Sequence, residues 1–163
     1  MNIQVVNDKD ELIGVKERTL IDYNRDIYRV SALWVTNLKG QVLLAKRSGS
    51  LQNDPGKWGP AVAGTVDANE TYEINICKEA KEEIGLDSLK FTKGPKIRIT
   101  KPRNYFCQWY FANLDKDIKD FTMQQGEVSD LAWVDIKELK HDLKYCSDKF
   151  IPTMIRTLIG LGL

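Results

Sequence analysis

Three glutamates at helical spacing are the residues of this chain whose types point most clearly to chemistry. Glu79, Glu82 and Glu83 lie in the run from Tyr72 to Ile84, which contains no Gly or Pro and is followed by Gly85. This pattern predicts an α-helix that ends at the glycine. The spacings place the three acids on one helix face, where like charges repel by roughly 0.2–0.5 kcal/mol per pair. A cation bound between them would offset that repulsion.

The acidic face has two interpretations. A hard divalent cation such as Mg²⁺ or Mn²⁺ prefers carboxylate and carbonyl oxygens and leaves coordination places for water and phosphate, so the glutamates predict a metal platform. Alternatively the face is only solvated, because Lys78 and Lys81 are interleaved with the acids. The apolar residues on the opposite side of the helical wheel are Ile74, Cys77, Ala80 and Ile84.

The spacing around these glutamates favours the metal interpretation. The segment from Gly64 to Leu86 resembles the Nudix signature, a series of Gly, Glu, Arg-Glu-aliphatic, Glu-Glu and Gly-aliphatic at fixed spacing. The positions in register are Gly64, Glu70, Glu79, Glu82, Glu83, Gly85 and Leu86. Two positions depart from the signature, because Lys78 stands in place of the Arg and Ala80 in place of a larger aliphatic residue.

The resemblance implies a fold and an activity. The fold is α/β, a Nudix-type α/β/α sandwich with a mixed β-sheet. The activity is that of a pyrophosphohydrolase, in which water activated by Mg²⁺ or Mn²⁺ attacks phosphorus in a nucleoside diphosphate linked to another moiety, or in a similar diphosphate. The implied metal ligands are Gly64, Glu79, Glu82 and Glu83. The implied catalytic residues, which take the proton of the water, are Glu82, Glu83 and Glu127.

Two more residues of the signature are implied to support the site. Glu70 is the partner of the residue at position 78. An Arg there holds carboxylates with a planar fork, whereas Lys78 offers one ammonium on a flexible stem. We therefore expect a less rigidly oriented ligand face and lower efficiency, with activity retained.

Three residues outside the signature are candidates for substrate binding. Arg47 lies between an apolar run and a polar loop, where a cation at a strand end can grip phosphate. Trp58 is either a core residue at the end of a sheet or a stacking wall for the substrate. Arg103 lies in a Pro-containing turn and is a second phosphate candidate.

Two other functions stay open from the sequence. Over roughly Ile3 to Leu139 the scaffold resembles the isopentenyl-diphosphate isomerases, which carry Cys-Gly-His where this chain has Ala63-Gly64-Thr65. The chain thus lacks the cysteine that handles the proton and a histidine metal ligand, and the isomerase-like branch of Nudix hydrolases fits better. The second alternative is a module that binds a nucleotide as a sensor, which the substituted Lys78 and Ala80 leave open.

Composition sets the broad class. The chain has 163 residues, 42% hydrophobic and 29% charged, which predicts one globular domain over residues 1–163. A net charge of +1 gives no general attraction to nucleic acid or to a membrane, so a small diphosphate is the expected partner. Nudix proteins often form homodimers, which the resemblance extends to this chain. The three cysteines fit neither a disulfide framework nor a zinc site, and no signal or membrane span is recognisable, so a cytoplasmic location is expected.

The elements that must position these residues are mostly strands. An N-terminal hairpin is expected over residues 3–15, and two C-terminal helices over about 135–160, where Asp135 to Glu138 has capping-box spacing. Further strands are expected over Arg29–Thr36, Gln41–Ala45, Ala61–Val66, Leu89–Thr92, Lys96–Thr100 and Tyr105–Leu114. The last run is apolar at both alternating sets of positions, which predicts a strand covered on both faces.

Overall fold

Strand β3 (Ile27–Thr36) is the centre of a nine-stranded mixed sheet. The computed structural model describes residues 1–163. The other strands are β1 (Asn2–Val6), β2 (Leu12–Glu17), β4 (Gln41–Arg47), β5 (Trp58–Pro60), β6 (Val62–Thr65), β7 (Thr92–Ile99), β8 (Tyr105–Asn113) and β9 (Val128–Asp135). β3 pairs in antiparallel fashion with β1, β4 and β6, and in parallel with β8. Four neighbours therefore fix its position.

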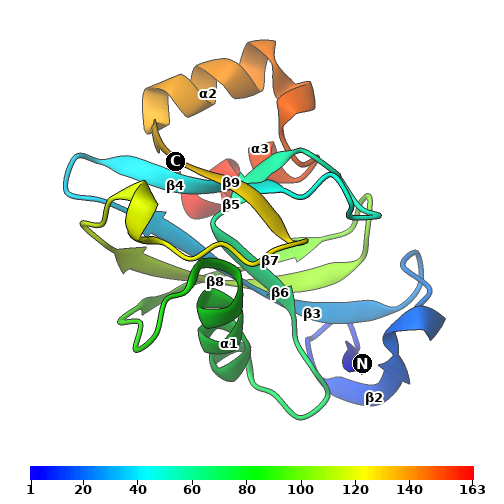
Figure 1. Ribbon diagram of the computed structural model, residues 1–163. Coiled ribbons are helices and arrows are strands. Elements are labelled where there is room, and N and C mark those ends of the chain that lie inside the picture. Colours follow the sequence, from blue (N-terminus) through cyan, green and yellow to red (C-terminus); the bar gives the residue numbers. More distant parts are fainter.

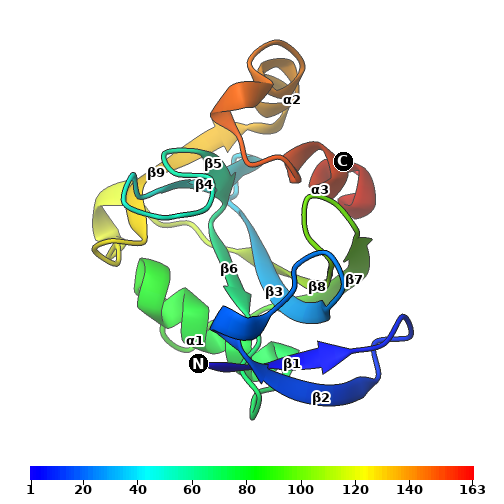
Figure 2. The same ribbon diagram turned by 90° about the vertical axis from the view of Figure 1, so that its right-hand side faces the viewer.

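Three helices cover the two faces of this sheet. α1 (Tyr72–Ile84) lies on one side of the strands, whereas α2 (Ile136–Tyr145) and α3 (Met154–Leu161) lie on the other (Figures 1 and 2). Short 3-10 turns occur at Arg18–Leu20, Ile118–Asp120 and Ser147–Lys149. The α/β fold with a mixed sheet between helices is therefore confirmed. No helix combines the length and the apolar character that crossing a membrane requires.

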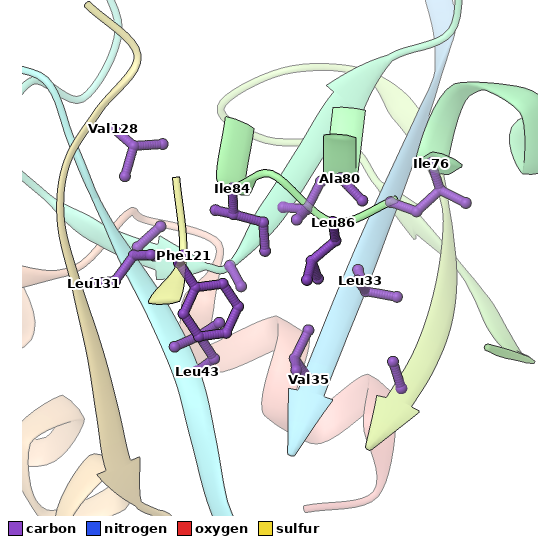
Figure 3. Packing of buried hydrophobic residues seen from close by; sticks show 14 of the residues in the cluster. Leu33, Val35, Leu43, Ile76, Ala80, Ile84, Leu86, Phe121, Val128 and Leu131 are labelled. Carbon is purple, nitrogen blue, oxygen red and sulfur yellow. The ribbon is translucent and has the colours of Figure 1, made fainter. Parts of the chain in front are cut away.

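The sheet divides the core into two halves. The half under α1 includes Leu33, Leu43, Ile76, Ile84 and Leu131, which point toward one another in Figure 3. The half under α2 and α3 includes Trp34, Trp109, Leu139, Met154 and Leu158. β8 contributes to both halves, because Trp109 belongs to the second and Tyr110 to the first. The prediction that this strand is covered on both faces is confirmed.

α1 has the predicted bounds and caps. The Thr71 side chain accepts a hydrogen bond from the backbone N–H of Ile74, and Gly85 ends the helix with a φ of 70°. The predicted buried side of the helix is partly wrong. Ile74 is 54% exposed and Cys77 is exposed, whereas the polar Asn75 is fully buried. A wheel based on hydrophobicity places an asparagine in solvent, and only tertiary hydrogen bonds make its burial favourable.

Two strand predictions need correction. The segments Leu89–Thr92 and Lys96–Thr100 were expected as separate strands, but one strand, β7, continues through Pro95. β7 lies at the edge and pairs only with β8, and its register shifts between Lys93 and Lys96, so the missing proline N–H disrupts no second ladder. The predicted strand Ala61–Val66 is confirmed as β6, which is one residue shorter at each end, and the short strand β5 directly before it pairs with β4.

A charged cluster fastens the N-terminal hairpin to the rest of the fold. The side chain of Asp10 is only 7% exposed and lies in the turn between β1 and β2. Its carboxylate accepts hydrogen bonds from Arg29 Nε at 2.7 Å, from the Tyr72 hydroxyl at 3.1 Å and from Lys96. Burial alone would raise the pKa of Asp10, but the hydrogen bonds from Lys96 and Arg29 outweigh it and hold the pKa below its usual value. The cluster thus joins β1–β2, β3, β7 and the first residue of α1.

We predict that Asp10→Asn lowers the free energy of unfolding at pH 7 by about 1–3 kcal/mol, because it removes the buried carboxylate that the half-buried Arg29 and the partly exposed Lys96 both bind. The folded-state pKa lies below the unfolded one, so this stabilisation is fully present above about pH 4 and is lost as the pH falls through the folded pKa. Urea unfolding across pH 2–7 should therefore show the two proteins converging in acid. Asp8→Asn, whose side chain is 93% exposed, is the control, and an equal effect of both variants would contradict the prediction.

Candidate functional site

The site begins where α1 touches β6. A Cβ atom on Gly64 would lie 2.3 Å from the Cγ and Cδ atoms of Glu79, closer than such atoms can approach. A side chain at position 64 would collide with the Glu79 side chain, so glycine leaves the space that this side chain occupies. On its other side β6 is held by β3, with Gly64 opposite Ser31 in the ladder. The Glu79 side chain is therefore packed directly against the backbone of β6.

Glu83 lies one helical turn further along the same face. Its Oε2 atom accepts a hydrogen bond from the backbone N–H of Ala63 at 3.3 Å. Burial raises the pKa of Glu83 well above its ordinary value, and the negative charges of Glu79 and Glu127 raise it further. The Ala63 N–H and the positive charge of Arg47 act in the opposite direction. Glu83 is thus the point at which acids from two segments of the chain meet.

Glu79 and Glu82 complete the acidic face. Burial raises the pKa of Glu79, Lys78 lowers it, and the neighbouring charge of Glu82 raises it again. The Glu82 side chain is exposed to solvent. No three acidic, His or Cys side chains are already gathered around one point as a closed ligand set. The acids are neighbours with repelling charges, next to the close contact at Gly64, and this set of hard oxygen donors fits a divalent cation.

A second set of polar contacts lies behind the acids. Lys78 Nζ is 2.7 Å from Glu70 Oε1 and 2.9 Å from Asp67 Oδ2, so the implied contact between Glu70 and the residue at position 78 is present. Lys78 Nζ is also 3.9 Å from Glu79 Oε1. Burial would raise the pKa of Glu70, but hydrogen bonds from Lys78 and Asn75 hold it below its ordinary value. Glu70 is therefore ionised and fixed in place.

Asn75 was not among the predicted site residues. Its Nδ2 atom donates to Glu70 Oε2 at 2.8 Å, to the Thr65 carbonyl at 3.1 Å and to Glu79 Oε1 at 3.4 Å. Its Oδ1 atom accepts a hydrogen bond from the Ser31 hydroxyl. The available signal was an amide on the same helix face as the acids, five residues after Glu70 and four before Glu79.

The four remaining candidates divide into two pairs. Arg47, at the end of β4, and Glu127 both lie close enough to influence the pKa of Glu83. The Glu127 carbonyl accepts a hydrogen bond from the Ser48 N–H at 2.8 Å, which ties its segment to the loop after β4. The structure does not bring Trp58 and Arg103 to the acids in this way. Trp58 packs at the margin of the core half under α2 and α3, and the Arg103 guanidinium stacks over the Tyr23 ring at 5.3 Å.

A small apolar cavity of about 50 Å³ lies between the sheet and the start of α3. Its walls come from β3, β5, β6, β7, β8 and α3 and include Ala32, Ala63, Ile97, Cys107, Trp109 and Thr157. Burial raises the pKa of the Cys107 thiol, which is therefore neutral. Because alternate residues of a strand point to opposite faces, the cavity meets β6 at Ala63 while the acids meet it at Gly64.

Comparisons with known proteins agree with this geometry. The model of the NUDIX domain family matches residues 27–154. An isopentenyl-diphosphate Δ-isomerase of Enterobacter sp. (strain 638) is 25% identical over 162 residues, covering 94% of this chain and 87% of that protein. A prenyl-diphosphate phosphatase of Methanosarcina mazei is 26% identical over 161 residues, covering 98% and 94%. The crystal structure of DR0079 from Deinococcus radiodurans superposes with a TM-score of 0.87 at 21% identity, covering 99% of both chains.

The family match spans most of the chain and includes the Gly64 contact, the acidic face of α1 and the segment that carries Glu127. The similar structure covers the N-terminal hairpin and the C-terminal helices as well. The chain therefore belongs to the NUDIX domain family and is a Nudix hydrolase, a pyrophosphohydrolase by class.

Proposed function

We propose that this chain is a divalent-metal-dependent hydrolase of a nucleoside diphosphate linked to another moiety, or of a similar diphosphate, in which water attacks phosphorus. The observation that carries the proposal is the contact of Gly64 with Glu79. It holds the acidic face of α1 against the edge of β6, beside the Ala63 N–H that binds Glu83. Acids in this arrangement repel one another, and a bound cation with its phosphate ligand would relieve that repulsion.

Each residue of the site then has a role. Gly64, Glu79, Glu82 and Glu83 would hold Mg²⁺ or Mn²⁺. When bound, such a cation neutralises charge on phosphate oxygens and lowers the pKa of water. Arg47, which lies near Glu83, would bind a phosphate oxygen. The carboxylate that takes the proton of the attacking water is one of Glu82, Glu83 and Glu127.

A second candidate substrate is the diphosphate of a small apolar alcohol. Two observations favour it: the apolar cavity reaches β6 at Ala63, next to the acidic site, and one relative is named a prenyl-diphosphate phosphatase. Apolar pockets with few polar groups select apolar ligand portions. In this version Trp109 and Ile97 would contact the hydrocarbon, while the diphosphate would lie toward Arg47 and the acids.

The isomerase alternative has less support. Isomerisation needs groups that add and remove a proton at carbon, and Ala63 and Thr65 stand at the positions where the isomerases carry Cys and His. The neutral Cys107 belongs to β8, not to β6 where the isomerases carry their Cys.

The sensor alternative rests on Lys78, which nevertheless contacts Glu70. A protein that binds nucleotides without metal-dependent turnover would be a sensor.

We predict that Glu82→Gln lowers Mg²⁺-dependent turnover by about 100-fold or more, because it removes a charge from the ligand face with little change of shape. Glu73→Gln is the matched control, since Glu73 is an exposed acid in the first turn of the same helix. The rate at which the phosphate monoester products form at saturating Mg²⁺ measures the effect. If Glu82→Gln retained activity within a few-fold of the parent, the role of Glu82 would be wrong.

We predict that Gly64→Ala displaces the Glu79 side chain from β6. The added methyl group would collide with Glu79, and such overpacking typically costs about 1–3 kcal/mol. A lower melting temperature should accompany loss of turnover. Gly14→Ala is the control, because no atom lies within 4 Å of a methyl group there. Full activity of Gly64→Ala would contradict the proposed geometry.

A substrate panel tests the leaving group. Nucleoside diphosphate sugars, dinucleoside polyphosphates and short prenyl diphosphates should be compared with Mg²⁺, with Mn²⁺ and with EDTA. We expect cleavage of the diphosphate bond that requires the cation, with both phosphate-bearing products detected by chromatography. Ala63→Leu would narrow the cavity and should reduce turnover of prenyl diphosphates more than that of nucleotides, if the apolar substrate is correct. Binding of nucleotides with no turnover of any compound would favour the sensor.

A further inference from the structure

Asn75 is a fully buried polar side chain near the site, and its relative exposure is 0%, as is that of its partner Ser31. Burying an amide is costly unless its hydrogen bonds are made, and here every buried side-chain polar atom has a partner. Three of the four partners of Asn75 are a backbone carbonyl and two carboxylates, which only accept hydrogen bonds. The Nδ2 atom must therefore face these acceptors, and Oδ1 must face the Ser31 hydroxyl.

This orientation makes Asn75 a bridge between the sheet and the acids. Ser31 lies in β3 and Thr65 lies in β6, so two paired strands hold the amide from one side. From the other side the amide donates to Glu70 and Glu79. Asn75 and Glu79 are one helical turn apart, a spacing at which side chains meet directly. Through Asn75, the direction of the Glu79 carboxylate is thus fixed relative to β3, the central strand of the fold.

Lys78 carries a single ammonium group, which leaves part of the orientation of the Glu70 and Glu79 carboxylates to another residue. Lys78 binds Oε1 of Glu70 and also Asp67, and it is 3.9 Å from Glu79. The second oxygen of Glu70, Oε2, is bound by Asn75 at 2.8 Å and by the Asp67 N–H at 3.3 Å. A guanidinium presents donors in a planar fork and can hold both oxygens of a carboxylate, but an ammonium is a point charge.

We infer that Asn75 is a positioning residue, which shares with Lys78 the task of orienting Glu70 and Glu79. The inference rests on the proposed function, in which Glu79 is a metal ligand. Lys78 supplies the charge that neutralises Glu70, and Asn75 supplies the directional donor that fixes the second oxygen of Glu70 and the near oxygen of Glu79. Neither side chain touches the reacting atoms.

The test is a double-mutant cycle. Asn75→Ala withdraws the donor, Lys78→Arg adds a fork in its place, and the double variant carries both changes. We expect Asn75→Ala to weaken Mn²⁺ binding by about 10–100-fold, measured calorimetrically without substrate. We also expect it to lower kcat by about 10–100-fold, with little change in KM. Lys78→Arg should restore a substantial part of that loss in the double variant and should strengthen Mn²⁺ binding by a smaller factor in the parent protein, where Asn75 already orients the carboxylates. No restoration by Lys78→Arg would overturn the inference.

Two further variants separate positioning from stability. Ser31→Ala leaves the Nδ2 donors in place, so its melting temperature should fall while Mn²⁺ binding falls much less than in Asn75→Ala. Asn75→Ser is the milder substitute if Asn75→Ala does not fold, since its hydroxyl can still pair with Ser31 but cannot reach the carboxylates. Equal losses of Mn²⁺ binding in Ser31→Ala and in the Asn75 variant would mean a purely structural role.

Crystal structures of the parent and Asn75→Ser give a readout that does not depend on turnover. The inference predicts that the Glu79 carboxylate and Oε2 of Glu70 change orientation when the donor is withdrawn, and unchanged orientations would overturn it. Failure of the proposed function would give a different result from failure of this inference. The parent protein itself would then show no metal-dependent hydrolysis of any substrate in the panel.

Discussion

The approach of α1 to β6 at Gly64 is the contact on which the remaining structure depends. It brings a helix carrying three acids against a strand, where burial and, to a smaller extent, their mutual repulsion raise the pKa values of Glu79 and Glu83. The buried apolar side chains of the same helix offset the cost of the repulsion. Burying an apolar side chain as large as Ile contributes roughly 1.5–3 kcal/mol, compared with roughly 0.2–0.5 kcal/mol lost per like-charged pair on a helix surface. Ile76 and Ile84 are both fully buried. Packing thus holds a charge distribution that would not persist alone.

β6 separates two chemical environments. Consecutive residues of a strand face opposite sides, so Gly64 meets the acids while Ala63 borders the apolar cavity. The Ala63 N–H nevertheless binds Glu83, which links the two sides through one peptide unit. A substrate with a charged end and a less polar end can use both environments only by passing the edge of this strand. The fold thereby sets the polarity pattern of the ligand, and side chains in the surrounding loops set its identity.

The sequence allowed the chemistry-bearing helix to be predicted closely, because its signals are local. Thr71, the unbroken run after it and Gly85 act within a few residues of one another, and the structure has the helix and both caps as expected. The burial of Asn75 depends on Ser31 and Thr65, which are distant in sequence, so no periodicity could indicate it. Pro95 was misread for a similar reason, since its tolerance depends on the edge position of β7. The cavity draws on six elements and has no local signal at all.

The parallel pairing of β3 with β8 runs without a break from Tyr28 and Tyr105 to Thr36 and Asn113. These strands are far apart along the chain, and the whole of α1 lies between them. Closing so long a loop carries an entropic cost that is met before most of the pairing contacts form, and topologies of this kind fold slowly. Ser31, the anchor of Asn75, lies in the middle of that ladder. A nascent chain would therefore acquire an oriented binding surface only when its second half had been synthesised and β8 had docked.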